Sequence, residues 1–385
     1  MTVSTVRLAE ISTDAQSGFA SGKSDPGGVL QVRMNNVTTD GSWDWSKERR
    51  VPTSEKQLAK YALRDGDVLV NVTNSPNLVG KTACFSGANE PVVFSNHFVR
   101  LRLDENRADA RFVRRWMNLL WKRRTFEGLC TQWVNQASVR KEDLLALRVP
   151  LPPLPEQRRI AAILDKADAV RRKRQQTLDL ADQFLRSAFL DLFGDPVTNP
   201  VGWDRLKLSD AVDLVNGRAF KSSEWSDRGK PIIRIQNLKD RSAPYNYFAG
   251  ECSESFNVES GDLLLAWAGQ LVSFGVHIWD GPAGLLNQHI FNVRPRVPFE
   301  LEYLEFALGQ VVELAKTGFH GIEMKHLTKA NLNRQQVLRP PEELQKRFAA
   351  QVRKLRASIR RLQSAGAGLY CLAGSLTQRA FRGEL

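Results

Sequence analysis

Features that mark several protein classes are missing from this sequence of 385 residues. No run of 18 or more apolar residues occurs, so the sequence predicts no membrane span. The segment from Met1 to Arg7 lacks the apolar stretch of a secretory signal peptide. The four cysteines are scattered without a Cys-x-x-Cys pair, which predicts neither a disulfide framework nor a zinc site. We therefore expect a reduced, cytoplasmic protein with no membrane partner.

Motifs for catalysis are missing as well. The sequence contains no H-E-x-x-H, G-x-S-x-G or GxGxxG, and no Asn/Asp-Pro-Pro-aromatic signature of the kind that holds a flipped base in amino-methyltransferases. The segment 79–82 ends like a phosphate-binding P-loop, but Ser75 replaces its first glycine, so a turn before a strand is the better interpretation. His97 and His289 lie in apolar strand contexts typical of structural histidines. We expect no catalytic residue, metal or cofactor in this chain.

A surplus of positive charge is present. The formal net charge is +13, and the isoelectric point is about 9.8. Lys and Arg gain free energy when they displace counterions from phosphates, so this surplus favours a polyanionic partner such as nucleic acid. A soluble protein with a basic surface remains the alternative.

The sequence repeats itself. Pro340-Pro341 lies 188 residues after Pro152-Pro153, and the same offset relates Arg347 to Arg159 and Ser375 to Ser187. Earlier in the units the offset is 201 between Asn36 and Asn237 and 192 between His97 and His289. Insertions therefore fall in the globular parts, whereas the segments after the prolines tolerate none.

Each repeat ends in a long helical pattern. The first pattern stops at Gly194-Asp195-Pro196, and the second carries apolar residues at alternating steps of four and three, the seam of a coiled coil. From Glu156 to Phe193 a helix would be roughly 55 Å long, which exceeds the ~34 Å of one DNA turn. We expect these residues to pack the helices or dock subunits: Ile160, Leu164, Ala167, Leu178, Leu185, Val352, Leu355, Ile359, Leu362 and Leu369.

The predicted fold class is α+β. Two tandem mixed α/β domains, 1–152 and 195–340, are separated by an antiparallel coiled coil of two long helices, 153–194 and 341–385, in a pseudo-two-fold repeat. Within the first domain we predict a half-buried strand over Phe98–Leu103, a helix over Arg111–Trp121 and a polar loop from Gly128 to Ser138.

Polar residues in the globular parts are candidates for DNA contact. Amides pair with adenine edges, arginines with guanine, and paired basic residues with phosphates. Each alone is more often a turn former or strand residue. The candidates are Arg33, Asn35, Asn36, Arg49, Arg50, Gln132, Asn135, Lys221, Arg234, Gln236, Asn237, His320 and Lys325. The basic run Arg171–Arg174 has three interpretations: a solvated helix flank, a phosphate track, or a contact for an acidic subunit.

Several of these motifs resemble one family. Pro152–Ala161 followed by Leu190–Pro196 is similar to the central region of the specificity subunit of type I restriction-modification systems, and Ser375–Leu385 resembles its C-terminus. Asn216–Ser222 and Ile233–Asn237 resemble its target-recognition domains. Two features depart from the pattern: segment 341–345 lacks the Glu-Gln pair, and Gly366 and Gly368 interrupt the helix.

The resemblance implies a non-catalytic subunit. Each target-recognition domain would read one half of a bipartite, asymmetric site in double-stranded DNA, and the long helices would set the spacer and dock two modification subunits. Those subunits would bind S-adenosylmethionine and methylate adenine, and a restriction subunit using ATP and Mg could join. From the residues alone, an autonomous sequence-specific DNA-binding protein and a structural coiled-coil protein with a protein partner remain alternatives.

Overall fold

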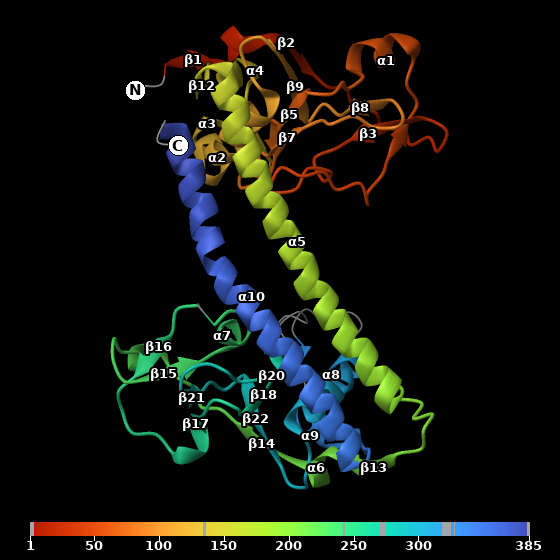
Figure 1. Cartoon of the computed structure of the whole chain (residues 1–385), viewed down its shortest axis with the longest axis vertical. Coiled ribbons are helices and arrows are strands. Elements are labelled where there is room, and N and C mark those ends of the chain that lie inside the picture. Colours follow the sequence, from red (N-terminus) through yellow and green to blue (C-terminus); the bar gives the residue numbers. More distant parts are fainter. Residues whose placement is uncertain are drawn as a thin grey trace. The chain divides into compact units, whose positions relative to one another are not determined.

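The computed structural model describes residues 4–133, 136–241, 243–269, 274–317, 325–326 and 328–382 (Figure 1). The chain forms two compact units. Unit 1 contains Met1–Arg174 and Ala365–Leu385, and unit 2 contains Gln175–Ser364. Each unit therefore combines one globular domain with a part of both long helices.

Unit 1 is organised around an antiparallel sheet in the order β2-β9-β5-β7. A second sheet, β4-β3-β8, pairs β3 and β8 in parallel. The helix α2 lies against β7. The elements of the domain are β1 (Thr5–Arg7), η1 (Leu8–Ile11), β2 (Ser12–Ser17), β3 (Val29–Val32), β4 (Arg50–Val51), α1 (Glu55–Tyr61), β5 (Val68–Asn71), β6 (Thr73–Asn74), β7 (Thr82–Cys84), β8 (Val92–Phe94), β9 (Phe98–Leu103), α2 (Ala110–Lys122), α3 (Thr125–Leu129), β10 (Thr131–Trp133), β11 (Gln136–Ser138), α4 (Lys141–Ala146) and β12 (Arg148–Pro150).

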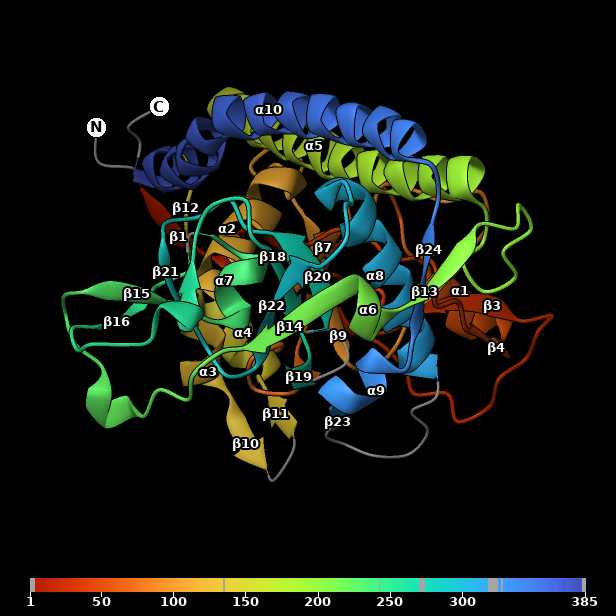
Figure 2. The same cartoon turned by 90° about the horizontal axis from the view of Figure 1, so that it is seen from below.

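Unit 2 repeats this topology. Its antiparallel sheet has the order β14-β22-β18-β20, with α8 beside β20 (Figure 2), and its second sheet has the order β16-β15-β21-β17. Its elements are β13 (Asp204–Lys207), α6 (Leu208–Ala211), β14 (Val212–Asn216), η2 (Ser222–Glu224), β15 (Lys230–Ile233), α7 (Ile235–Lys239), β16 (Asn246–Phe248), η3 (Glu254–Phe256), β17 (Asn257–Val258), β18 (Leu263–Ala266), β19 (Ala268–Gly269), β20 (Gly275–Ile278), β21 (Gly284–Leu286), β22 (Ile290–Pro295), α8 (Leu301–Thr317), β23 (Lys325–His326), α9 (Lys329–Asn333) and β24 (Gln336–Arg339).

The strand registers confirm the internal repeat. Val68 faces Leu101 in unit 1, and Leu263 faces Val293 in unit 2. Val68 and Leu263 differ by 195 positions and Leu101 and Val293 by 192, within the range from 201 to 188 that the repeat spans in the sequence. The parallel pair β3–β8 likewise recurs as β15–β21.

The two long helices are α5 (Leu154–Phe193, 40 residues) and α10 (Glu342–Arg382, 41 residues). A buried glutamine fixes the start of each one. The Gln157 side chain accepts from the Asp109 amide and donates to the Pro152 carbonyl, and Gln345 accepts from the Glu300 amide and donates to the Pro340 carbonyl. The second repeat thus replaces Glu156 by Leu344 but keeps the glutamine that holds the domain.

Apolar anchors show that the helices run antiparallel. In unit 1, Ile160 and Leu164 near the start of α5 share a core with Phe381 at the end of α10. In unit 2, Phe348 near the start of α10 shares a core with Phe193 at the end of α5. Phe193 and Phe381 are themselves related by the offset of 188. Each domain is therefore bound by the start of its own helix and the end of the other.

The predicted seam is only partly a helix-to-helix contact. Ile160, Leu164, Leu185 and Val352 are buried in domain cores, and Ala167, Leu178, Leu355 and Ile359 are half-buried. Leu362 is 50% exposed, so it does not pack inside this chain, and its role in subunit docking stays a prediction. The side chain of Leu369 lies outside the described residues.

Ion pairs of opposite polarity join each domain to its helix. In unit 1, Arg115 of α2 pairs with Asp165 of α5 at 2.6 Å and with Asp168. In unit 2 the helix supplies the cations: Arg353 and Arg356 of α10 pair at 2.6 and 2.7 Å with Glu302 and Glu305 of α8. These pairs are called the helix clasps below.

The clasps occupy equivalent positions with inverted charge. The offset of 188 relates Asp165 to Arg353 and Asp168 to Arg356. On the domain side, the backbone amides of Asp109 and Glu300 donate to the equivalent glutamines and give an offset of 191. This offset relates Glu302 and Glu305 to Arg111 and Arg114, which lie 3.7 and 3.3 Å from Asp165, whereas Arg115 corresponds to Phe306.

Two of three local expectations were wrong. Phe98–Leu103 is not half-buried, because every residue except Arg102 is buried and Arg100 pairs inside with Asp14 at 2.6 Å. The expected polar loop 128–138 contains the hairpin β10–β11. The turn interpretation of segment 79–82 is confirmed, since the buried Lys81 ammonium donates to the carbonyls of Met34 and Val37.

Candidate nucleic-acid interface

A cleft of about 450 Å³ in unit 1 gathers three of the predicted DNA-contacting residues, Arg33, Asn35 and Arg49. Its walls come from the end of β3, the loop that follows β2, and the turn between β8 and β9, which contributes Asn96 and His97. The sequence predicts a structural role for His97, and its carbonyl does accept from the Val72 amide. His97 also lines this cleft, which its apolar strand context did not indicate.

Asn36 builds the loop that carries Arg33. Its side-chain oxygen accepts from the Arg33 amide at 2.9 Å, and its side-chain nitrogen donates to the Asp44 and Lys47 carbonyls at 2.9 and 3.1 Å. The side chain is buried. A buried amide with all these bonds made is costly to release, so Asn36 supports the loop and is not free to contact a base.

The Arg33 guanidinium forms no hydrogen bond or ion pair with any residue that the structure describes, and its Nε is shielded from solvent. Arg49 is held at the cleft wall, where its Nη2 donates to the Ser21 carbonyl at 3.1 Å. The pKa of His97 is lowered, first by burial and second by the charge of Arg33. The cleft therefore disfavours protonation of His97 and presents Arg33 without a counterion among the residues that the structure describes.

A loop supported by a buried asparagine also occurs in unit 2. Asn237 is buried, its side-chain oxygen accepts from the Arg234 amide at 3.0 Å, and its nitrogen donates to the Ala243 carbonyl at 3.1 Å. Asn237 is thus the structural counterpart of Asn36 and, like it, is not free for base contact. Arg234 occupies the position of Arg33.

The surroundings of Arg234 differ from those of Arg33. Its guanidinium donates to the Asn246 side chain at 2.9 Å and lies 5.4 Å from the ring centroid of Trp225, which is 41% exposed. Trp225 was missed in the sequence, although an aromatic residue in the polar segment 221–230 was a usable signal. The candidates Lys221 and Gln236 are exposed nearby in the chain. An exposed indole beside an arginine is suited to stacking and groove contacts.

The remaining candidates are not gathered with these groups. Arg50 forms a bidentate ion pair with Glu90, with N···O distances of 2.6 and 2.7 Å. Asn135 and His320 lie outside the described residues, as do the side chains of Gln132 and Lys325. Arg171, from the basic run, lies 3.5 Å from Asp40.

No group of three or more His, Cys, Asp or Glu side chains able to hold a metal ion occurs in the described part of the chain. None of the helices described here combines the length and apolar character needed to cross a bilayer. The arrangement offers cationic and aromatic side chains on loops, which is suited to binding an anionic polymer.

Comparison with known proteins agrees with this arrangement. The model of the type I restriction modification DNA specificity domain matches residues 13–179 and again 200–363. A putative type I restriction enzyme MjaX specificity subunit from Methanocaldococcus jannaschii is 22% identical over 323 residues, 78% of this chain and 74% of that protein. The EcoKI specificity subunit of Escherichia coli strain K12 is 24% identical, covering 92% of this chain and 82% of its own length.

Solved structures share the fold. The S subunit of a type I restriction-modification system from M. genitalium superposes with a TM-score of 0.63 at 16% identity, covering 98% of this chain and 96% of that one. A chain from a structure of type I R-M complex assembly gives 0.51 at 20% identity, with 99% and 98% covered. Two specificity-domain matches, one on each structural repeat, account for most of the sequence, and the chain belongs to the type I restriction-modification DNA specificity family.

Proposed function

We propose that this chain is the DNA-reading subunit of a type I restriction-modification complex, and that each unit reads one half of a bipartite site. The observation that carries the proposal is that both units contain the same loop, in which a buried asparagine positions an arginine. Arg33 and Arg234 stand at equivalent positions, each set by a buried asparagine, within domains of one topology. Arginine is the side chain that most often reads guanine, through two hydrogen bonds in the major groove.

The two half-sites differ in this proposal. Arg33 lies in a cleft beside His97, whereas Arg234 lies beside the exposed indole of Trp225 and donates a hydrogen bond to Asn246. Because a base is selected by the donors, acceptors and apolar surface around it, different surroundings favour different sequences. The site would therefore be asymmetric.

Catalysis belongs to other subunits in this proposal. We propose two modification subunits that bind S-adenosylmethionine, and a restriction subunit that uses ATP and Mg, all acting with this chain in the cytoplasm. A docking surface for a protein partner is available on α5, where Leu180 and Phe184, one helical turn apart, are 63% and 61% exposed. Apolar residues left in water on one helix face favour burial against another chain.

The test is methylation-site mapping after co-expression with the modification subunit. A split, asymmetric motif is expected. Arg33→Ala should weaken DNA binding by about 1–3 kcal/mol and relax the sequence requirement in one half only. Arg50→Ala is the matched control, because Arg50 is already paired with Glu90 outside the cleft. Its half-site preference should be unchanged.

Two results would overturn the proposal. A continuous palindromic motif would contradict reading by two different units. Tight, sequence-specific binding by the isolated chain, with no effect on methylation by the partner, would instead identify an autonomous DNA-binding protein.

A further inference from the structure

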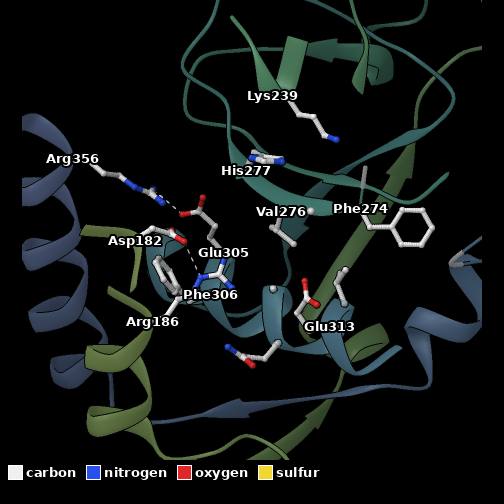
Figure 3. Close-up of a pocket in the computed structure, with 14 residues that line it drawn as sticks. Asp182, Arg186, Lys239, Phe274, Val276, His277, Glu305, Phe306, Glu313 and Arg356 are labelled. Atoms are coloured by element: carbon white, nitrogen blue, oxygen red, sulfur yellow. Dashed lines mark hydrogen bonds and ion pairs between the residues drawn. The ribbon is translucent and has the colours of Figure 1, made fainter. Parts of the chain in front are cut away.

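A cavity in unit 2 has a counterpart in unit 1 that is filled by the chain itself. The cavity measures about 250 Å³ and is lined by residues of α5, α7, β20, α8 and α10. Figure 3 shows Lys239 of α7, His277 of β20 and Glu305 of α8 around it, with Arg356 reaching Glu305 from α10.

The loop Thr38–Ser42 occupies the equivalent space in unit 1. A side chain placed on Gly41 of this loop would lie 2.3 Å from Asn118 Nδ2, 2.6 Å from the Thr82 carbonyl oxygen and 3.2 Å from Arg114. Gly41 is buried, and its positive φ of 78° suits a glycine in so close a turn.

All three neighbours of Gly41 have counterparts that line the cavity. The strand registers relate Thr82 to Val276. The offset of 191 along the α2 and α8 helices relates Arg114 to Glu305 and Asn118 to Gly309. The space that Gly41 fills in unit 1 is therefore the cavity in unit 2.

The segment of unit 2 that corresponds to the loop Thr38–Ser42 is shorter than in unit 1. In unit 1 the segment from the buried Asn36 to Arg50, which pairs with β3, contains the loop. The equivalent segment of unit 2, from Asn237 to Tyr247, which pairs with β15, is four residues shorter. Gly309 in place of Asn118 enlarges the space further, since a side chain placed on Gly309 would have nothing within 4 Å.

Three cations and three carboxylates line the cavity. Because Asp182 pairs with Arg186 and Glu305 with Arg356, Lys239 is the cation that favours an anionic occupant. Lys239 forms no ion pair, and the His277 ring no hydrogen bond, with any described residue. Burial, together with the charges of Arg241, Arg356 and Lys239, lowers the pKa of His277 to about 4. In unit 1 the occupant is itself acidic: Asp40 accepts from Ser42 and lies 3.5 Å from Arg171 of α5.

We propose that this cavity receives an acidic turn of the modification subunit, which completes unit 2 as residues 38–42 complete unit 1. The identity of the partner rests on the proposed function, and the need for an acidic turn does not. The cavity of about 250 Å³ would receive the tip of such a turn, as Gly41 enters the equivalent space in unit 1.

The first experiment uses the full chain and a probe copied from unit 1. The probe is a dye-labelled peptide of residues 37–43, cyclised through added terminal cysteines because Val37 and Trp43 already pair across the loop. Fluorescence anisotropy should show saturable binding. An Asp40→Asn probe and a Lys239→Glu chain should each weaken it at least about fivefold, as loss of a charge pair does.

Gly309→Trp should abolish binding without unfolding the chain, because the new side chain enters open space. Gly128→Trp is the matched control, since a side chain on this helical glycine in unit 1 also meets nothing within 4 Å. Absence of saturable binding, equal binding to Gly309→Trp, or equal competition by free aspartate would each overturn the acidic-turn site.

The second experiment tests the partner. Gly309→Trp should weaken association with the modification subunit about tenfold or more while leaving the DNA sequence preference of this chain intact. Unchanged association, together with a split methylation motif, would overturn the partner assignment and leave the proposed function standing. If the wild-type chain itself does not direct methylation to a split motif, the proposed function is contradicted.

Discussion

At the scale of single residues, His277 makes unit 2 sensitive to acid. Burial and nearby cations lower its pKa from 6.5 to about 4. The unfolded chain binds the proton at its ordinary pKa, so the stability contribution is complete above pH 6.5 and is lost as the pH falls towards 4. The free energy of unfolding of unit 2 should fall by about 2 kcal/mol between pH 7 and pH 5 on this account.

Hydrogen exchange of β20 peptides at pH values between 5 and 7, corrected for intrinsic exchange rates, measures this dependence. The variant His277→Gln should remove most of it. His97→Gln is a useful control because His97 has a lowered pKa but lies in unit 1. An unchanged acid response in His277→Gln would show that another group is responsible.

Residue types alone did not separate base readers from loop supports. Asn35, Asn36, Gln236 and Asn237 have the same amide chemistry in the sequence. Only the folded chain shows that Asn36 and Asn237 are buried and bonded to the backbone, whereas Asn35 and Gln236 are exposed. The distinction depends on the path of the following loop, which short-range sequence rules do not determine.

At the scale of elements, the helix clasps predict a charge-reversal experiment. Arg353→Asp with Arg356→Asp places new carboxylates against Glu302 and Glu305 and leaves Glu305 buried without a cation. Breaking buried pairs costs about 3–5 kcal/mol, but Arg353 is largely exposed, so a loss of about 2–4 kcal/mol is expected. Urea unfolding measures the loss.

Adding Glu302→Arg and Glu305→Arg to that variant should restore most of the stability, because the junction then has the polarity of unit 1. The same reversal in unit 1, Asp165→Arg with Asp168→Arg, gives a matched comparison. If the fourfold variant is no more stable than the double variant, the ion pairs do not hold the domain on its helix.

Periodicity predicted the long helices well but not the partners of their apolar stripe. The boundaries Leu154–Phe193 and Glu342–Arg382 agree with the sequence pattern. A repeat of apolar residues identifies a buried face, yet it does not say what covers that face. Phe348 and Val352 fit a coiled-coil seam, and in the structure they lie in the core of domain 2. The covering surface comes from residues far away in the sequence.

At the scale of the molecule, the repeat itself was the strongest signal in the sequence. A constant offset of 188 over the long helices predicted two equivalent domain–helix junctions, and Gln157 and Gln345 form them with the same hydrogen bonds. What the sequence did not reveal was the difference between repeats. The cavity in unit 2 results from a shortened loop together with Gly309. These two changes are far apart in the sequence, and the equivalent strand pairs of the two units show that they lie at the same place in the fold.

The constant offset also predicts that the two helices must be lengthened together. Each domain is anchored by the start of one helix and by Phe193 or Phe381 at the end of the other. Four residues inserted after Gln175 and four after Gln363, positions related by 188, add about 6 Å to both helices and rotate each by only about 40°. At about 3.4 Å per base pair, the spacer between the half-sites should lengthen by one or two base pairs, measured by mapping methylated sites.

Insertion into α5 alone tests the same idea from the other side. It shifts Phe193 relative to the start of α10 without moving Phe348, its partner in the core of unit 2. The single insertion should therefore destabilise unit 2 more than the double insertion does, because only the double insertion keeps both anchors in register. A spacer that stays constant in the double variant would contradict the view that the helices set the distance between the readers.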